Sequence, residues 1–163
     1  LQAQTDKRIP NKIIQLGHID KELLADYYAN ADVFIHPNPR EPFGIAPLEA
    51  MASGVPTLAP NAGGILSYAT DENAWLTEPT GENFAETVRE IMEKPDLRKQ
   101  KTAKAVETAR LNTWEVSTDR LLATYDQMFE DFQKRNELFT DKKAAKTFDY
   151  RIVSDKSSPI SGS

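Results

Sequence analysis

Residues 36–64 read HPNPREPFGIAPLEAMASGVPTLAPNAGG, and the prolines and glycines of this stretch predict its local structure. Glu41 precedes a proline, which favours extended backbone, so we expect a loop over 37–42. Pro47 has no amide hydrogen and is tolerated only in the first turn of a helix. The helix that contains it is therefore expected to begin at about Gly44.

The second half of the stretch predicts the end of that helix and the segments after it. Gly54 suits the left-handed conformation that closes many helices, and Pro56 prevents the helix from resuming. We expect a short buried strand over 55–59 and a tight glycine loop over 60–64. Loop, helix, strand and glycine loop in this order form half of a nucleotide-binding α/β unit.

The predicted start of the helix offers groups that bind anions and sugars. The amides of Gly44, Ile45 and Ala46 fall in the first turn, where they lack intrahelical acceptors and lie at the positive end of the helix dipole. Such an end binds phosphate readily, and a glycine lets a ligand approach the backbone closely. Glu41 and Glu49 bracket these amides, and each carboxylate offers two acceptor oxygens for paired sugar hydroxyls.

The spacing of these two glutamates carries a resemblance to a known family. Seven residues, PFGIAPL, separate Glu41 from Glu49, and the chain then continues EAMASGVPTLAPNAGG from Glu49. This pattern resembles the E-x7-E signature of retaining glycosyltransferases of the GT-B fold, group 1 (GT4-like), in their C-terminal, donor-binding domain. The resemblance extends over roughly residues 9–139.

The resemblance implies roles for individual residues. It implies that Glu41 contacts the transferred sugar as the catalytic residue and that Glu49 holds the ribose hydroxyls. Backbone amides at the start of the helix would face the sugar or the phosphates, and the glycine pair would lie beside the donor. The donor-binding residues are then His36, Arg40, Phe43, Gly44, Ile45, Glu49, Gly63 and Gly64.

Two of these residues have an alternative interpretation, and two neighbours depart from the family pattern. His36 is either a site residue or a strand end satisfied by the backbone. Arg40 either neutralises a phosphate or forms an ion pair with Glu41. Leu66 and Ser67 stand where the family often has a proline and a glutamate, so no acidic role is expected there.

The flanking sequence predicts an α/β fold. Apolar runs over 12–16 and 32–36 indicate buried strands, with a helix between them that begins after Asp20 and buries its apolar face. Strand, helix and strand at this spacing require a crossover and a parallel sheet, so His36 falls at the carboxyl edge, where such sheets bind ligands. The predicted fold class is α/β, a partial doubly wound parallel sheet of the Rossmann-like, GT-B type with C-terminal helices.

The chain is expected to have three parts. Residues 1–112 are part of the nucleotide-sugar-binding Rossmann-like domain, 113–139 form a C-terminal helix capped by Ser117, and 140–163 form a flexible tail. Trp114 and the helix after it are most simply core, although the resemblance implies that part of this face packs on an N-terminal domain. The apolar residues of the helix are Leu121, Leu122, Tyr125, Met128, Phe129 and Phe132.

Composition excludes several classes of function. The 163-residue chain has 25 acidic and 20 basic side chains, and its net charge of −5 gives no support to nucleic-acid binding. It has no cysteine and only two histidines, so we expect no disulfide and no metal site. We also expect no cofactor, because no G-x-G-x-x-G follows a predicted strand and no lysine motif for pyridoxal phosphate is present. No apolar run approaches the ~18 residues of a membrane span, so we expect a cytoplasmic protein, with peripheral membrane contact left open.

The resemblance implies an enzyme that, at full length, transfers a sugar from a nucleotide-sugar donor to an acceptor hydroxyl with retention of configuration. We expect the chain to be a truncated piece of a longer protein. The resemblance implies an N-terminal acceptor domain and a basic pair that binds the diphosphate, and both would precede Leu1. The isolated chain is expected to bind nucleotide weakly and to be inactive. Two alternatives stay open: a non-catalytic nucleotide-sugar-binding or regulatory module, and another sugar-nucleotide enzyme on this fold, such as an epimerase or a phosphorylase. The donor sugar, the nucleotide that carries it (UDP, GDP or ADP) and the acceptor also stay open.

Overall fold

The computed structural model describes residues 13–136, 140, 141 and 143. Contacts divide the chain into two compact units, Leu1–Asn112 and Thr113–Ser163. The tail predicted over 140–163 lies outside the described residues, except at 140, 141 and 143. The functional assignment of the three predicted parts stays a prediction.

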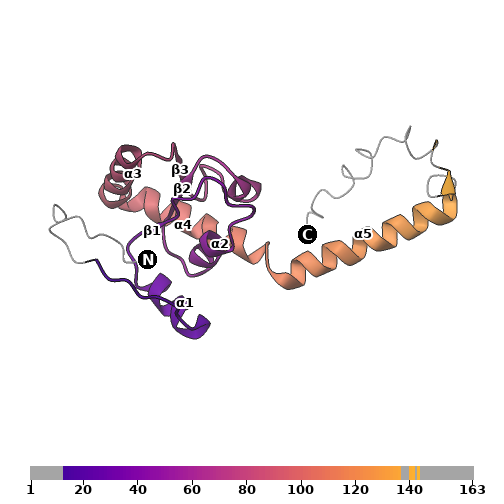
Figure 1. The fold of residues 1–163 in the computed structure, drawn as a ribbon, viewed down its shortest axis with the longest axis horizontal. Coiled ribbons are helices and arrows are strands. Elements are labelled where there is room, and N and C mark those ends of the chain that lie inside the picture. The colour runs from indigo at the N-terminus through magenta and orange to yellow at the C-terminus, as the bar shows by residue number, and fades with distance from the viewer. Residues whose placement is uncertain (1–12, 137–139, 142, 144–163) are drawn as a thin grey trace. The chain divides into compact units, whose positions relative to one another are not determined.

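In the described residues, the first unit contains a sheet of three parallel strands (Figure 1). The strands are β1 (Phe34–Ile35), β2 (Thr57–Pro60) and β3 (Trp75–Thr77), in the order β1-β2-β3. Phe34 pairs with Thr57, and Leu58 pairs with Trp75. Because neighbouring strands are parallel, their carboxyl ends meet at one edge of the sheet. The predicted α/β fold is confirmed.

The helices of the described residues begin and end at local sequence signals. They are α1 (Lys21–Ala29), α2 (Ile45–Ala52), the 3-10 helix η1 (Gly64–Ser67), α3 (Gly81–Glu93), α4 (Pro95–Arg110) and α5 (Trp114–Lys134). Pro47 lies in the first turn of α2, and Gly54 follows its end at φ +74°. Thr80 caps α3 through its side chain, and Pro95 opens α4, where no amide hydrogen is needed. None of these helices has the length and apolar character needed to cross a membrane.

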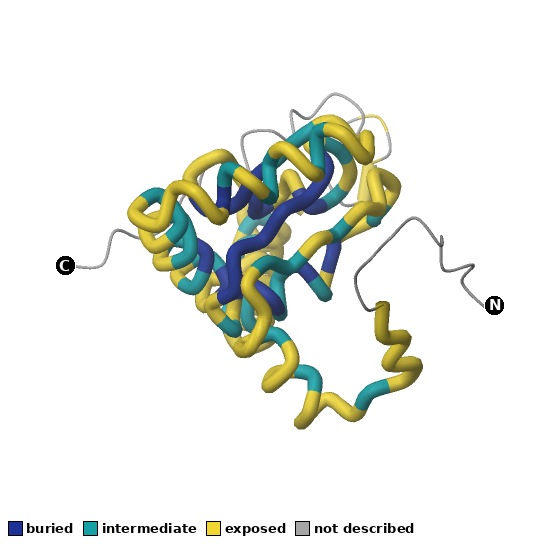
Figure 2. Tube along the Cα trace, turned by 90° about the vertical axis from the view of Figure 1, so that its left-hand side faces the viewer, coloured by how far each residue is buried: buried dark blue, intermediate teal, exposed yellow. Residues whose placement is uncertain are grey.

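Both faces of β2 are covered, so every residue of this strand is buried. Successive residues of a strand point to opposite faces of the sheet. Leu58 packs with Trp75 and with Ile91 of α3, whereas Ala59 belongs to a second cluster with Met51 of α2. Figure 2 shows the buried residues gathered in the interior, beneath the exposed helical turns. A parallel strand covered on both faces is typical of doubly wound sheets.

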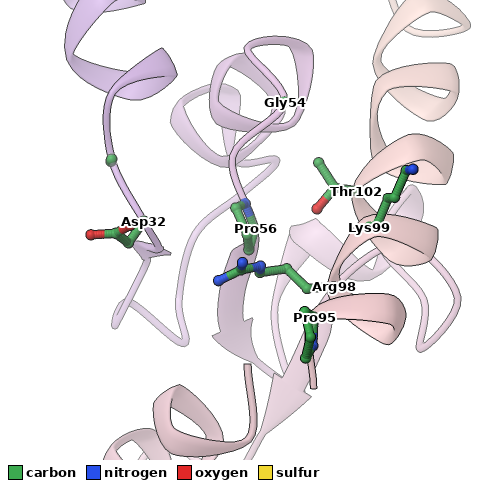
Figure 3. Close-up of a pocket in the computed structure, with 8 residues that line it drawn as sticks. Asp32, Gly54, Pro56, Pro95, Arg98, Lys99 and Thr102 are labelled. Carbon is green, nitrogen blue, oxygen red and sulfur yellow. The ribbon is translucent and has the colours of Figure 1, made fainter. Parts of the chain in front are cut away.

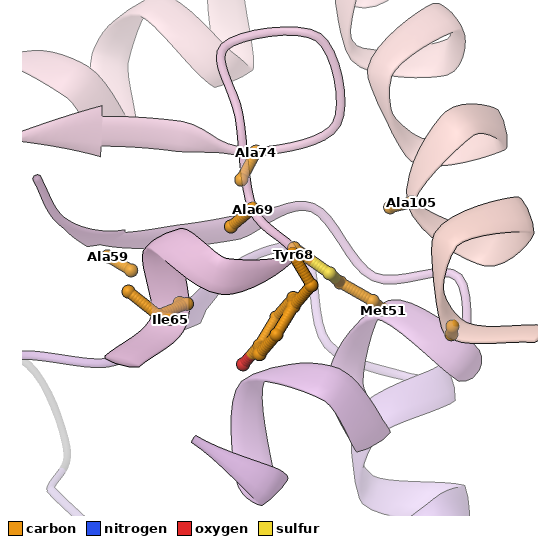
Figure 4. Close-up of a cluster of buried hydrophobic side chains, with 8 residues drawn as sticks. Met51, Ala59, Ile65, Tyr68, Ala69, Ala74 and Ala105 are labelled. Atoms are coloured by element: carbon orange, nitrogen blue, oxygen red, sulfur yellow. The ribbon is translucent and has the colours of Figure 1, made fainter. Parts of the chain in front are cut away.

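The larger of the two clusters joins α2, β2, η1 and α4 (Figure 4). Met51, Ile65 and Ala105 are each at most 1% exposed. Tyr68, which directly follows η1, belongs to the same cluster. The cluster therefore fixes α2, the helix that carries Glu49, against the sheet and against the segment that follows β2.

The strand predicted over 12–16 is wrong for its described residues, 13–16, which form no strand. The sheet of the described residues ends at β1, so no neighbouring strand pairs with this backbone. The predicted buried face of α1 is also wrong, because α1 has no buried residue. Leu24 and Tyr28 are only half-buried, since the sheet does not continue beneath them.

The core position predicted for Trp114 and the helix after it is wrong. Trp114 is 84% exposed, and α5 has no buried residue. The helix begins at Trp114, and Thr113, not Ser117, caps it by accepting a hydrogen bond from the Val116 amide. In the described residues, α5 is the only helix of the second unit with defined bounds. A single amphipathic helix cannot enclose its own apolar stripe.

We expect Met51→Ala to destabilise the first unit by about 2–5 kcal/mol, because it opens a cavity between α2, η1 and α4. Urea denaturation would measure the free energy of unfolding. Met92→Ala is the matched control: Met92 lies on α3 and is 48% exposed, so its loss should change stability by no more than about 0.5 kcal/mol. Equal effects of the two substitutions would contradict the packing described for Met51.

Candidate donor site at the carboxyl edge of the sheet

The predicted site residues come together where β1 and β2 end. His36 follows β1, and a loop over 37–43 leads from it to α2. Gly63 and Gly64 follow β2. Because β1 and β2 are parallel neighbours, both loops leave the sheet at the same edge, and open α/β sheets bind their ligands at this edge.

The glycine loop packs directly on the loop that carries Glu41. The amide of Gly64 donates a hydrogen bond to the carbonyl oxygen of Glu41 at 2.7 Å. A Cβ atom on Gly64 would lie 1.8 Å from the carbonyl oxygen of Pro42, so no other residue fits there. Gly63 adopts φ +81°, and a Cβ atom on it would lie 2.9 Å from the carbonyl oxygen of Pro39. Both glycines are therefore required for the two loops to meet.

Two side chains surround the carboxylate of Glu41. Asn38 donates from Nδ2 to Oε2 of Glu41 at 3.1 Å, and the Arg40 amide donates to Oδ1 of Asn38 at 3.0 Å. His36 Nε2 lies 3.8 Å from the same Oε2 atom, which is too far for a hydrogen bond. The sequence did not single out Asn38, whose amide keeps one carboxylate oxygen of Glu41 in place.

The structure bears on the two residues, His36 and Arg40, for which the sequence left two interpretations open. The backbone amide of His36 donates to the Leu58 carbonyl, as expected for a strand end. The His36 side chain is not satisfied in that way, because its Nε2 atom is buried and has no hydrogen-bond partner among the described residues. Arg40 is exposed and, in the part of the chain that the structure describes, forms no ion pair with Glu41.

The amino end of α2 presents unpaired amides beside this loop. Gly44 is the N-cap residue, at φ +91°, so the predicted start of the helix is correct to within one residue. Within the described residues, the amides of Gly44, Ile45 and Ala46 donate to no acceptor, as expected for the first turn of a helix. The side chains of Phe43 and Ile45 are 41% and 61% exposed. Gly44 itself is buried, so the amides of Ile45 and Ala46 are the more open of the three, and all three keep their hydrogen-bonding capacity unused within the described residues.

Tyr68 is a residue of this region that sequence reasoning missed. Its hydroxyl donates a hydrogen bond to the Gly44 carbonyl, and its ring packs on Phe43 with 5.2 Å between the ring centres. Burial, and to a smaller extent the charge of Glu41, raise the pKa of Tyr68 far above the usual value. A buried tyrosine hydroxyl needs a partner, but nothing in the sequence indicates one that lies 24 residues away.

Glu49 lies in the second turn of α2, with its side chain half-buried. Its carboxylate has neither a hydrogen-bond donor nor an ion-pair partner among the described residues. Burial first, and then the charge of Glu49, raise the pKa of Tyr28 on α1. Glu49 is thus close to α1 and still able to accept hydrogen bonds from a ligand.

A separate pocket of about 440 Å³ lies at the opposite edge of the sheet (Figure 3). Asp32 and Pro56, which precede β1 and β2, line it together with Arg98, Lys99 and Thr102 of α4. It contains none of the predicted site residues, and it adjoins the amino ends of the strands, not their carboxyl ends. Among the described residues, no group of three or more histidine, cysteine or acidic side chains could hold a metal ion.

Comparison with known proteins agrees with this geometry. The profile of the family described as "Glycosyl transferases group 1" matches residues 1–108. The chain belongs to the group 1 glycosyltransferases. Its structural neighbours are GT-B glycosyltransferases, which agrees with the parallel sheet and its covering helices.

Individual relatives of this group 1 glycosyltransferase chain are more than twice as long as the chain itself. It is 29% identical over 109 residues to the GDP-mannose-dependent alpha-(1-6)-phosphatidylinositol dimannoside mannosyltransferase of Mycobacterium tuberculosis, covering 67% of this chain and 28% of that protein. Sucrose-phosphate synthase from Thermosynechococcus elongatus superposes with a TM-score of 0.63 and 31% identity, over 71% of this chain and 30% of that one. Anabaena Alr3699/HepE in complex with UDP superposes with a TM-score of 0.57 and 25% identity, over 63% of this chain and 29% of that one. The chain therefore spans between a quarter and a third of the length of these proteins.

We expect Gly64→Ala to separate the glycine loop from the loop of Glu41, because the new methyl group would overlap the Pro42 carbonyl. The expected loss of stability is about 1–3 kcal/mol, typical of overpacking. Urea denaturation measures this loss, and amide chemical shifts over 38–44 report the displaced loop. Gly81→Ala is the control, since nothing lies within 4 Å of a Cβ atom there. Unchanged shifts over 38–44 in Gly64→Ala would show that the loops do not meet as described.

Proposed function

We propose that the chain is the donor-binding part of a retaining, GT4-like glycosyltransferase that transfers a sugar from a nucleotide-sugar to an acceptor hydroxyl. The observation that carries this proposal is the contact between the glycine loop and the loop of Glu41. This contact holds a carboxylate and the amino end of a helix side by side at the carboxyl edge of a parallel sheet. In a nucleotide-sugar, the sugar hydroxyls need a carboxylate and the diphosphate needs the amides at a helix start.

The amides at the start of α2 would bind the diphosphate, because the helix dipole adds a positive potential where Gly44 and Ile45 are unpaired. Negative charge grows on the diphosphate as its bond to the sugar breaks, while the acceptor oxygen bonds to the same carbon and the proton of the acceptor hydroxyl passes to an oxygen of the departing diphosphate. Preorganised amides favour that state over the ground state, which is an electrostatic contribution to catalysis. Arg40 is exposed in the adjoining loop and would add a positive charge near the phosphates.

Glu41 would contact the transferred sugar. Its side chain is 29% exposed, and Asn38 holds one of its carboxylate oxygens while His36 lies beside the same atom. The carboxylate is thus held in one orientation and still open to a ligand on its exposed side. We propose that Glu41 is the catalytic residue and that His36 lies at the border of the sugar subsite.

Glu49 would hold the ribose hydroxyls, because its carboxylate has no partner among the described residues. Named relatives support a nucleotide-sugar donor without deciding the base. One is named as GDP-mannose-dependent, whereas Alr3699/HepE is described in complex with UDP, with UDP and glucose, and with UDP-glucose. Since the chain spans about 28% of the mannosyltransferase, we propose that acceptor binding and turnover require parts outside it.

We expect Glu49→Ala to abolish binding of the nucleotide that the wild-type chain prefers among UDP, GDP and ADP. The substitution removes both acceptor oxygens for the ribose hydroxyls, and isothermal titration calorimetry measures the affinity. Glu86→Ala is the control, because Glu86 is an exposed residue within α3 and is not among the predicted site residues. Absence of binding of all three nucleotides to the wild-type chain at millimolar concentration would contradict the proposed donor site.

We expect Glu41→Gln to weaken binding of the nucleotide-sugar but not of the free nucleotide. The substitution removes the charged hydrogen bonds to the sugar, and the affinity for the nucleotide-sugar should fall roughly 10- to 100-fold. The hydrogen bond from Asn38 can persist, because glutamine keeps one acceptor oxygen. Parallel titrations with UDP and UDP-glucose, or the matching pair for another base, measure the difference. Glu86→Gln, at an exposed position within α3, is the control. Equal weakening of both ligands would place Glu41 at the nucleotide instead of the sugar.

A further inference from the structure

Tyr68 connects the core to the amino end of α2. It is 7% exposed and belongs to the buried cluster with Met51 and Ile65 (Figure 4). Its hydroxyl leaves that cluster and donates to the Gly44 carbonyl oxygen, 2.5 Å away. None of the roles implied by the family resemblance involves this residue.

The hydrogen bond acts on the first peptide group of the helix. The carbonyl of Gly44 and the amide of Ile45 belong to one planar trans peptide, so the C=O and N–H bonds point in opposite directions. A donor that holds the Gly44 carbonyl on one side therefore also directs the Ile45 N–H toward the other side. The Ile45 amide is one of those that have no acceptor among the described residues.

Little else restrains this peptide. Gly44 lies at φ +91°, in a region that glycine enters and leaves at low cost. The other hydrogen bond to its carbonyl comes from the Leu48 amide at 3.3 Å, which is slightly longer than the usual range for such bonds. Pro47, one position closer in the chain, has no amide hydrogen to offer. The Tyr68 hydroxyl is therefore the main restraint on the orientation of the Gly44–Ile45 peptide.

We propose that Tyr68 is a positioning residue that directs the Ile45 amide toward a phosphate of the donor. This inference rests on the proposed function, which places the diphosphate at the start of α2. The hydroxyl touches the peptide and not the ligand, so its effect on binding passes through the Ile45 N–H. Donation to the carbonyl also polarises the peptide and strengthens the same N–H as a donor.

Two features keep the Tyr68 hydroxyl in this role. A tyrosine hydroxyl is protonated at neutral pH and can donate, and burial, together with the nearby negative charge of Glu41, raises the pKa of Tyr68 further. Its ring is held between the core cluster and Phe43, which limits where the hydroxyl can point. A Cβ atom at position 44 would lie 2.8 Å from this hydroxyl, so the bond also requires glycine there.

The test uses Tyr68→Phe in the full 163-residue chain, because this change removes the hydroxyl and keeps the ring. In the unliganded chain, 15N relaxation and residual dipolar couplings report the motion and direction of the Ile45 N–H. We expect its order parameter to fall from about 0.85 toward about 0.6, with amides of β2 unchanged. Tyr125→Phe on α5 is the matched control. An Ile45 amide with the same order parameter and coupling in Tyr68→Phe as in wild type would overturn the proposal.

A second measurement separates this inference from the proposed function. We expect Tyr68→Phe to weaken nucleotide binding about tenfold, the scale of one hydrogen bond, with Tyr125→Phe unchanged. A purely structural role would lower the melting temperature and leave the affinity as in wild type, and that result would overturn the proposal while the donor site stands. If the wild-type chain binds no nucleotide, the proposed function fails and the role of Tyr68 toward phosphate fails with it.

Discussion

The contact between two backbone segments, Gly63–Gly64 and the loop over 39–43, is the constraint on which the site depends. The Gly64 amide binds the Glu41 carbonyl, and the Pro42 carbonyl lies where a side chain on Gly64 would begin. Such a close approach is possible only between a glycine and a bare backbone segment. It holds the loop of Glu41 against the segment after β2, and it thereby places the carboxylate next to the amino end of α2.

The sheet makes this contact possible. β1 and β2 are parallel neighbours, so the loops that follow them emerge at the same edge. β2 is buried on both faces, which leaves its position no freedom relative to α2 and α3. Tyr68 belongs both to this core and to the site, because its ring packs inside and its hydroxyl reaches Gly44. Packing of the core and orientation of the first α2 peptide are therefore linked through one side chain.

The two incorrect burial predictions have a common physical cause. The apolar spacing on α1 and on α5 correctly indicates helices with an apolar face. Spacing does not say which surface covers that face, since the covering surface is a property of other segments. In the described residues, the sheet ends at β1 and so does not extend beneath α1, and α5 is the only helix of its unit with defined bounds. Both faces are accordingly exposed to a large extent.

The sequence by itself determined the features that depend on a few adjacent residues. Pro47 and Gly54 set the bounds of α2, and the pattern over 41–64 predicted the family. The α/β fold class was predicted as well, although one of the two strands used for that prediction, over 12–16, does not form. Only the tertiary structure decided which groups surround Glu41, which residue holds the Gly44 carbonyl, and that no strand forms over 13–16. Backbone sterics act between neighbours in the chain and can be read from them. Hydrogen bonds and strand pairing join residues that are far apart in the sequence, so their partners exist only once the chain has folded.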